Sequence, residues 1–256
     1  MIYDLQKADI WKRASAGLFD VILRIIASVG CIFLISLIIG FNGVSEKFEV
    51  RQALYETKYG VSFDAIENQD DFNKLSVEEQ ELINKAYEEF SKDEEAVYLF
   101  NMLFQLTIIT VTFGILIAYL ILEFAVPMMF KNGQTLGKKI FGVAVMRLDN
   151  VKISGPLLFI RSILGKYTIE TMVPIMLLLM TAFGVVGPLG IGVILLVFLT
   201  GIIMMLATKT NSMIHDMLAN TVVVDFASQM IFDSPEELLA YKQKIHEEAV
   251  KRAEYR

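Results

Sequence analysis

The chain has 256 residues, of which 55% are hydrophobic and 20% are charged, and its formal net charge is -6. An ordinary soluble domain has roughly 45 to 50% apolar and about 25% charged residues, so this composition argues against a soluble globular enzyme. The acidic balance also argues against nucleic-acid binding, which depends on basic residues that neutralise phosphates.

Cysteine and histidine are too sparse for redox or metal chemistry. The single cysteine, Cys31, excludes an intrachain disulfide and a cysteine metal cluster. His215 and His246 lie far apart in the sequence with no partnering cysteine, which argues against a zinc site. We therefore expect neither a cofactor nor a bound metal.

Three long uncharged runs dominate the chain, at positions 25–41, 97–122 and 171–208. A hydrocarbon core about 30 Å thick needs about 20 mostly apolar helical residues, so these runs predict membrane spans. The segment from Met1 to Arg13 is polar, and the run after it is long enough to span. We therefore expect no cleavable signal peptide.

The first span is predicted from Leu18 to Phe41, and an acidic insert follows it at residues 42–96. The insert has fifteen Asp and Glu against six Lys and Arg, which gives a net charge of -9. Ser76 and Glu79 form a capping-box pattern ahead of apolar residues at helical spacing, which predicts a small helical insert. The alternative is a mostly disordered acidic loop.

The second span is predicted from Val97 to Val126, with Glu123 near its end and Pro127 directly after it. The next loop, Met128 to Pro156, contains five Lys and Arg against one Asp, a net charge of +4. Because short loops rich in Lys and Arg stay in the cytoplasm, this loop is predicted to be cytoplasmic.

Residues 157–208 predict two closely spaced helices joined by a turn rich in glycine and proline, Pro188 included. Basic residues flank the pair, whereas the turn is uncharged. The sequence therefore predicts four spans, with both termini in the cytoplasm and the acidic insert outside. In the alternative, Leu157 to Tyr167 lies along the inner membrane surface and only three segments span.

Outside the spans, short segments predict a small sheet and a tail helix. Thr221 to Asp225 is β-branched and short, which favours a strand. Phe141 to Met146, with Val151 to Ile153 beyond a turn, favours a second pairing element. Ser234 and Pro235 predict the start of a solvated C-terminal helix.

Ionisable residues inside spans are the candidate functional residues, because charges are costly in a bilayer. Asp20 and Arg24 are four positions apart, on one helix face, and Arg13 lies two turns earlier. Glu123 and Glu170 add two more membrane carboxylates, and Lys166 lies one helical turn before Glu170. With Asp20, they would suit a cation or proton relay, although satisfied structural ion pairs explain the same spacing.

The loop Gly133-Gln134-Thr-Leu-Gly137-Lys138-Lys139 is not a nucleotide-binding loop. That motif needs four residues between its glycines and a hydroxyl residue after the lysine, whereas this loop has three and a second lysine. We interpret it as a tight cytoplasmic turn whose lysines suit lipid headgroups.

Three blocks of the sequence stand out together: Lys12 to Asp20 (KRASAGLFD), Asn132 to Asn150 (NGQTLGKKIFGVAVMRLDN) and His215 to Val224 (HDMLANTVVV). In this order they resemble the signature motifs of the RDD family of membrane proteins. Within them, the resemblance assigns the family's arginine and two aspartates to Arg13, Asp20 and Asp216, and a further family arginine to Arg161. Two departures stand out: Asn220 replaces the family's usual glycine, and the insert is long and acidic.

Together, the apolar runs, the short β-branched segments and the acidic insert predict an all-α membrane protein with about four transmembrane helices, short cytoplasmic β-strands and a small extracytoplasmic helical insert. The expected segments are 1–41, 42–96, 97–225 and 226–256: first helix, insert, membrane core and cytosolic tail helix. We expect a non-enzymatic cell-membrane protein that works as a homo-oligomer and transports a small cation, with cation/proton exchange as one form of that transport. The alternative is an accessory or regulatory subunit that binds another membrane protein through its insert or tail.

Overall fold

A computed structural model describes residues 5–66, 69–130, 132–187 and 189–254. Lys131 of the basic loop and Pro188 of the predicted turn lie outside the described residues. The chain forms two compact units. The membrane core unit comprises the residues up to Cys31 together with those from Gly114 onward, and the insert unit comprises Ile32 to Phe113.

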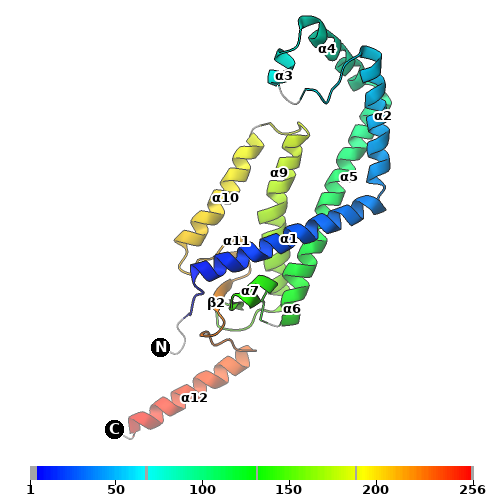
Figure 1. The fold of residues 1–256 in the computed structure, drawn as a ribbon. Coiled ribbons are helices and arrows are strands. Elements are labelled where there is room, and N and C mark those ends of the chain that lie inside the picture. The colour runs from blue at the N-terminus through cyan, green and yellow to red at the C-terminus, as the bar shows by residue number, and fades with distance from the viewer. Residues whose placement is uncertain (1–4, 67–68, 131, 188, 255–256) are drawn as a thin grey trace. The chain divides into compact units, whose positions relative to one another are not determined.

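Within the part of the chain that the structure describes, four helices are long and apolar enough to cross a membrane (Figure 1). They are Ile10–Ile38, Glu94–Phe130, Gly155–Ala182 and Leu189–Ala207. This confirms the predicted four-helix fold class. The segment from Leu157 to Tyr167 belongs to the third of these helices, and the structure does not separate it as a surface helix.

The first helix, α1 (Ile10–Ile38), begins earlier than predicted because Asp9 caps it. An Asp9 carboxylate oxygen accepts a hydrogen bond from the backbone N–H of Trp11 at 3.0 Å, which satisfies a donor that the first turn leaves open. The helix ends at Ile38, shortly before Gly40, whose φ of 73° is unfavourable for most residues.

The second and third membrane helices each contain a π-helical stretch that ends just before a proline. The second consists of α5 (Glu94–Tyr119), η1 (Leu120–Ala125) and α6 (Val126–Phe130). The third consists of α8 (Gly155–Phe159), η2 (Ile160–Met172) and α9 (Val173–Ala182). Pro127 and Pro174 follow the two stretches. Proline has no N–H and clashes with the carbonyl of the preceding turn, so the wider turn accommodates it and the helix continues.

A two-stranded antiparallel sheet lies in the membrane core unit, as the sequence predicted. β1 (Val143–Arg147) pairs with β2 (Thr221–Asp225) so that Val145 lies opposite Val223. The segment after β1 adds an isolated bridge between Met146 and Lys152.

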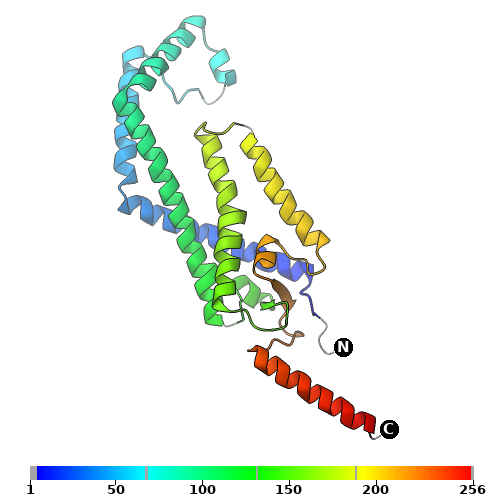
Figure 2. The same cartoon turned by 180° about the vertical axis from the view of Figure 1, so that it is seen from behind.

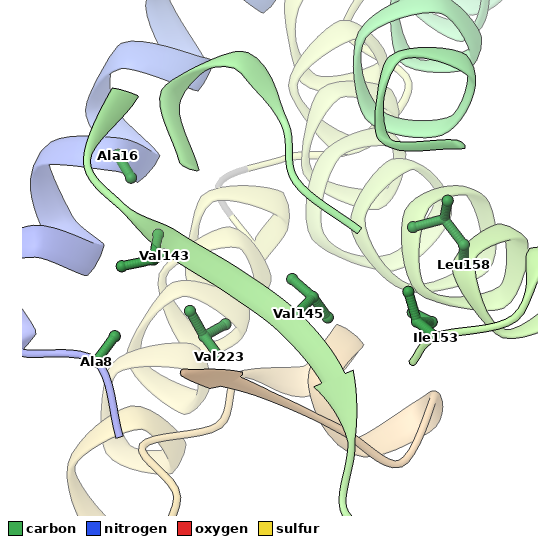
Figure 3. Packing of buried hydrophobic residues seen from close by; sticks show 7 residues of the cluster. All are labelled: Ala8, Ala16, Val143, Val145, Ile153, Leu158 and Val223. Carbon is green, nitrogen blue, oxygen red and sulfur yellow. The ribbon is translucent and has the colours of Figure 1, made fainter. Parts of the chain in front are cut away.

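Small apolar side chains join this sheet to the helices around it (Figure 3). Figure 3 shows side chains from the N-terminal region, β1, β2 and the third membrane helix meeting in one cluster. Its buried members are Ala8, Ala16, Val143, Val145, Ile153, Leu158 and Val223. Because Ala8 and Ala16 are small, the start of α1 lies close to the sheet and to the loop before it.

The last part of the core unit forms a hairpin and a tail. α9 packs against α10 (Leu189–Ala207), and the two run antiparallel (Figure 2). The short helix α11 (Ile214–Leu218) follows and packs against η2. The tail helix α12 (Pro235–Glu254) begins after Ser234, whose hydroxyl accepts a hydrogen bond from Glu237, as predicted.

The insert unit is helical, which confirms the predicted helical insert over the disordered alternative. It contains α2 (Phe41–Tyr59), α3 (Gln69–Asn73) and α4 (Val77–Lys92), together with parts of α1 and α5. Ser76 and Glu79 form the predicted capping box. Aromatic contacts join α2, α4 and the loop between α2 and α3. The rings belong to Phe48, Tyr55, Phe63, Tyr87 and Phe90.

Candidate functional site

A network of charged side chains lies within the membrane core unit, between α1, the glycine loop and the two π-helical stretches. Its five cationic members are Arg13, Arg24, Lys138, Arg161 and Lys166. Its four carboxylates are Asp20, Glu123, Glu170 and Asp216. Each carboxylate has a cation or an imidazole beside it, as burial in a poorly solvated place requires.

Asp20 fastens α1 to the glycine loop. Its carboxylate accepts hydrogen bonds from the Thr135 hydroxyl and, at 2.8 Å, from the backbone N–H of Gly137, and Lys138 Nζ lies 3.4 Å away. A Cβ at Gly137 would clash with the carbonyl oxygen of Ala16. Only glycine allows this approach, so the loop sequence is matched to the start of α1.

Arg24 has a different partner from the one that its spacing suggested. Instead of Asp20, one helical turn earlier, its guanidinium binds Glu123 on η1, and it lies 5.2 Å from the centre of the Tyr119 ring. The arginine therefore joins the first membrane helix to the second.

Glu123 is held between two cations and is 1% exposed. One carboxylate oxygen binds Arg24, and the other accepts a hydrogen bond from Lys166 Nζ at 2.7 Å. The backbone carbonyl of Glu123, which Pro127 leaves without its helical N–H partner, accepts a hydrogen bond from the Ser162 hydroxyl at 2.7 Å. Glu123 lies on η1 and Lys166 lies on η2, so both partners of this ion pair are on π-helical turns.

Asp216 binds two arginines from different helices. Arg161 donates two hydrogen bonds to Oδ1, at 3.0 and 2.6 Å, and Arg13 lies 3.7 Å from Oδ2. The Arg13 guanidinium also donates to the backbone carbonyls of Thr210 and Asn211. Burial alone would raise the pKa of Asp216, but the charge and hydrogen bonds of Arg161, with the charge of Arg13, outweigh it and hold that pKa below its ordinary value.

Glu170 pairs with His215 rather than with Lys166. The His215 backbone N–H and ring Nδ1 donate to the Glu170 carboxylate at 3.1 and 2.9 Å. Burial lowers the pKa of His215, so its imidazole is neutral at pH 7. Gly165 permits this contact, because a Cβ there would lie 2.5 Å from the Cβ of His215.

Contrary to the sequence prediction, the glycine loop is not a turn throughout: its second half forms the short helix α7 (Leu136–Ile140), which Thr135 caps by accepting a hydrogen bond from the backbone N–H of Lys138 (Figure 1).

The other residues of the glycine loop also have structural contacts. Gln134 donates to the backbone carbonyl of Val143 at 2.9 Å, and Gly133 has a φ of +61°. Lys139 is exposed and its Nζ lies 3.8 Å from the centre of the Phe130 ring, whereas Lys138 is buried toward Asp20. Of the two lysines expected to meet lipid headgroups, only Lys139 is therefore on the open surface.

The backbone conformation at Asn220 accounts for the asparagine that replaces the family's usual glycine. Its φ is 48°, in the left-handed region that favours glycine, and asparagine is among the side chains that best tolerate it. The substitution therefore keeps the turn that leads into β2.

The network brings together residues that sequence spacing left separate. The sequence indicated neither the pairing of Arg161 with Asp216 nor that of Lys166 with Glu123, because both join distant segments. Pro127 and Pro174 were the sequence features that could have indicated the π-helical turns before them. Within the described residues, no group of three or more His, Cys, Asp or Glu could hold a metal ion.

Comparison with known proteins gives one match. A family model described as the RDD family matches residues 7–220, which includes every charged residue of the network. No curated protein and no solved structure matches the chain.

Proposed function

Because the chain belongs to the RDD family of membrane proteins, we propose that it is a transporter without enzymatic activity, which exchanges a small cation for protons at Glu123 and Lys166. One observation carries the proposal. A carboxylate that is 1% exposed lies inside a membrane-length helix and is bound by a lysine from another such helix, each on a π-helical turn. Intramembrane ionisable pairs mark ion and proton pathways, and π-helical turns are frequent at functional sites.

The two cations on Glu123 differ in what they can release. Arg24 keeps its proton under all ordinary conditions, whereas a lysine can lose one. When Lys166 releases a proton, a small cation can bind the carboxylate oxygen that the ammonium leaves. One positive charge departs as another enters, so the net charge of the network stays the same through the exchange.

The other two candidate carboxylates are less suited to this exchange. Asp20 is held by a hydroxyl, a backbone N–H and a lysine of one loop, so a cation there would release the loop from α1. Glu170 binds both the backbone and the ring of His215, which positions α11. We therefore assign the exchange to Glu123 and structural positions to Asp20 and Glu170.

Replacing Lys166 with arginine tests the assignment, because arginine keeps the positive charge but cannot release a proton. Purified protein in sealed proteoliposomes should move protons in response to a Na⁺, K⁺ or Li⁺ gradient, and Lys166→Arg should abolish that movement. Lys12→Arg is the matched control, since Lys12 forms an exposed ion pair with Asp225. Full exchange by folded Lys166→Arg protein would contradict the assignment.

We further propose that the protein lies in the cell membrane with the loop at residues 128–156 and both termini in the cytoplasm. The charges of +4 on this loop and -9 on the insert support this orientation. Cysteines placed singly at Asp149 and Glu88 in a Cys31→Ser background report it through a membrane-impermeant thiol reagent. Labelling at position 88 alone is expected in intact cells, and labelling at position 149 alone would reverse the orientation.

A second candidate function is the binding of another membrane protein through the insert unit. A cavity of about 530 Å³ in this unit favours it, since aromatic side chains line it. They are Phe48, Phe63, Tyr87, Phe90 and Phe100. Replacing residues 45–95 with a short linker separates the candidates. A transporter keeps its proton flux after this deletion, whereas an accessory subunit loses co-purification with its partner.

Four helices enclose little volume, so a transport pathway fits best between subunits of a homo-oligomer. Cross-linking of the purified protein in lipid tests this part of the proposal, and an active monomer would contradict it.

A further inference from the structure

A cavity of about 310 Å³ lies within the membrane core unit, and members of the charged network line it, although Glu123 itself does not. Elements far apart in the sequence enclose it: the start of α1, the glycine loop, η2 and the segment from the end of α10 to α11. Its cationic lining residues are Arg13, Lys138, Arg161 and Lys166. The remaining ionisable residues that line it are His215 and Asp216.

The lining has an excess of positive charge that its partners do not cancel. Four cations face one carboxylate in the lining. Two further carboxylates bind lining lysines from outside the lining: Asp20 binds Lys138, and Glu123 binds Lys166. With them, four cations stand against three carboxylates. Including Arg24 and Glu170, the whole network has five cations and four carboxylates, and the neutral His215 adds no charge. In both counts, four against three and five against four, one positive charge has no carboxylate to balance it.

Uncompensated charge is costly in a poorly solvated site within a membrane protein, so an anion in the cavity would stabilise the fold. Arg13 is the least compensated member. It lies 3.7 Å from the nearer oxygen of Asp216, compared with 2.6 Å for Arg161, and its two hydrogen bonds are to neutral carbonyls. Arginine and lysine together are the side chains that bind phosphate most effectively.

The rest of the lining is apolar and reaches the surface. Trp11 and Leu18 on α1 are 77% and 64% exposed, and Met205 and Met213 line the other side. Tryptophan favours the membrane–water interface, and an apolar rim of this kind suits acyl chains rather than a free ion in water. The cavity volume is near the lower end for ligand pockets, about 300–1,000 Å³, so it suits a headgroup and not a whole lipid.

We propose that this cavity binds the phosphate headgroup of an anionic phospholipid, whose acyl chains lie along the exposed apolar side chains at the start of α1. Basic pockets between membrane helices bind anionic headgroups by the same chemistry. The proposal concerns an anion in this cavity, whereas the exchange concerns a cation at the Glu123 carboxylate; Lys166 is the one residue that belongs to both sites.

The position of the only tryptophan provides a direct assay. Trp11 is the single tryptophan of the chain and lies at the rim of the cavity. Its fluorescence in vesicles should be quenched by brominated phosphatidylglycerol at about fivefold lower mole fraction than by brominated phosphatidylcholine. A factor of five corresponds to about 1 kcal/mol, the typical contribution of one basic residue near anionic lipid.

Two variants and one competitor complete the experiment. Arg13→Gln should remove the preference for phosphatidylglycerol, whereas Lys12→Gln, with the same change of charge at a residue outside the cavity lining, should keep it. Equal quenching of the wild-type protein by both lipids overturns the proposal without any variant. If inorganic phosphate abolishes the preference, the site takes a free anion, and the lipid assignment is wrong. No ion gradient enters this assay, so its failure leaves the exchange proposal unaffected.

Discussion

Ion pairs occur in both units of the protein, but their surroundings differ. In the membrane core unit, the side chains of Arg161 and Asp216 are 2% and 1% exposed. In the insert unit, those of Lys92 and Glu88 are 70% and 66% exposed. A buried charge that loses its partner has no water to replace it, whereas solvent screens an exposed one. The buried pair of Arg161 and Asp216 is therefore structurally essential, whereas the exposed pair of Lys92 and Glu88 is nearly neutral.

The two units also differ in the size of the side chains that pack in them. Large aromatic rings pack the insert unit, as in the contact between Phe48 and Phe90. In the membrane core unit, small residues such as Ala16 and Gly137 allow backbones to approach closely around the charged network. Close approach of backbones is what shields the charges, so the small residues and the buried ion pairs depend on each other.

The largest expected effect comes from breaking the most buried pair. Asp216→Asn should lower the free energy of unfolding by about 3–5 kcal/mol, because it leaves Arg161 buried without its carboxylate. Thermal unfolding in detergent measures the change, with Glu88→Gln in the insert unit as the control that should have little effect. A loss below about 1 kcal/mol for Asp216→Asn would show that the site is better solvated than its burial indicates.

A pair of glycine substitutions should change stability in opposite directions. Gly137→Ala makes a Cβ clash with the Ala16 carbonyl oxygen and should destabilise the core unit by about 1–3 kcal/mol. Gly43→Ala, on α2, meets nothing within 4 Å and should stabilise by up to about 1 kcal/mol through helix propensity. Thermal unfolding of both variants checks the signs. Equal stability of Gly137→Ala and the wild type would mean that the loop does not pack tightly on α1.

The two units should respond to acid in different pH ranges. Burial lowers the pKa of His215 below 6.5, so the unfolded chain binds a proton that the folded protein does not. Stability of the core unit is therefore present above about pH 6.5 and falls as the pH drops below that value. In the insert unit, hydrogen bonds from Arg51 and Tyr55 hold the pKa of Asp93 below 3.8, so its contribution is lost only below about pH 4.

Thermal unfolding between about pH 8 and 5 measures the histidine contribution, with His215→Gln as the variant that should lack it. A wild-type melting temperature that rises as the pH falls through this range would mean that His215 gains a proton on folding instead of excluding one.

The smallest effect is expected at the surface of the insert. Lys92→Ala removes an exposed pair with Glu88, one helical turn earlier on α4, and should leave the melting temperature unchanged within error. Circular dichroism melting checks this. A substantial drop would mean that the exposed pairs of the acidic helices act as a network.

Local patterns predicted the local structure well. Apolar run lengths indicated the four helices, the capping box at Ser76 located α4, and β-branched residues indicated the strand at residues 221–225. The partners in the charged network could not be predicted in this way. Spacing along a helix favoured Asp20 with Arg24 and Glu170 with Lys166, yet each of these residues binds a partner on another segment. In a membrane helix bundle, buried charges find partners across helices, and a single sequence does not specify that register.

Cation-dependent proton flux is the decisive measurement for exchange at Glu123. Wild-type protein, Glu123→Gln and the control Glu88→Gln are reconstituted separately in sealed vesicles, and the internal pH is recorded after a pulse of Na⁺, K⁺ or Li⁺ at about pH 6 to 9. Exchange at Glu123 predicts flux for the wild type and for Glu88→Gln, and none for folded Glu123→Gln protein. The absence of flux from wild-type protein with all three cations would contradict the claim, as would full flux from Glu123→Gln.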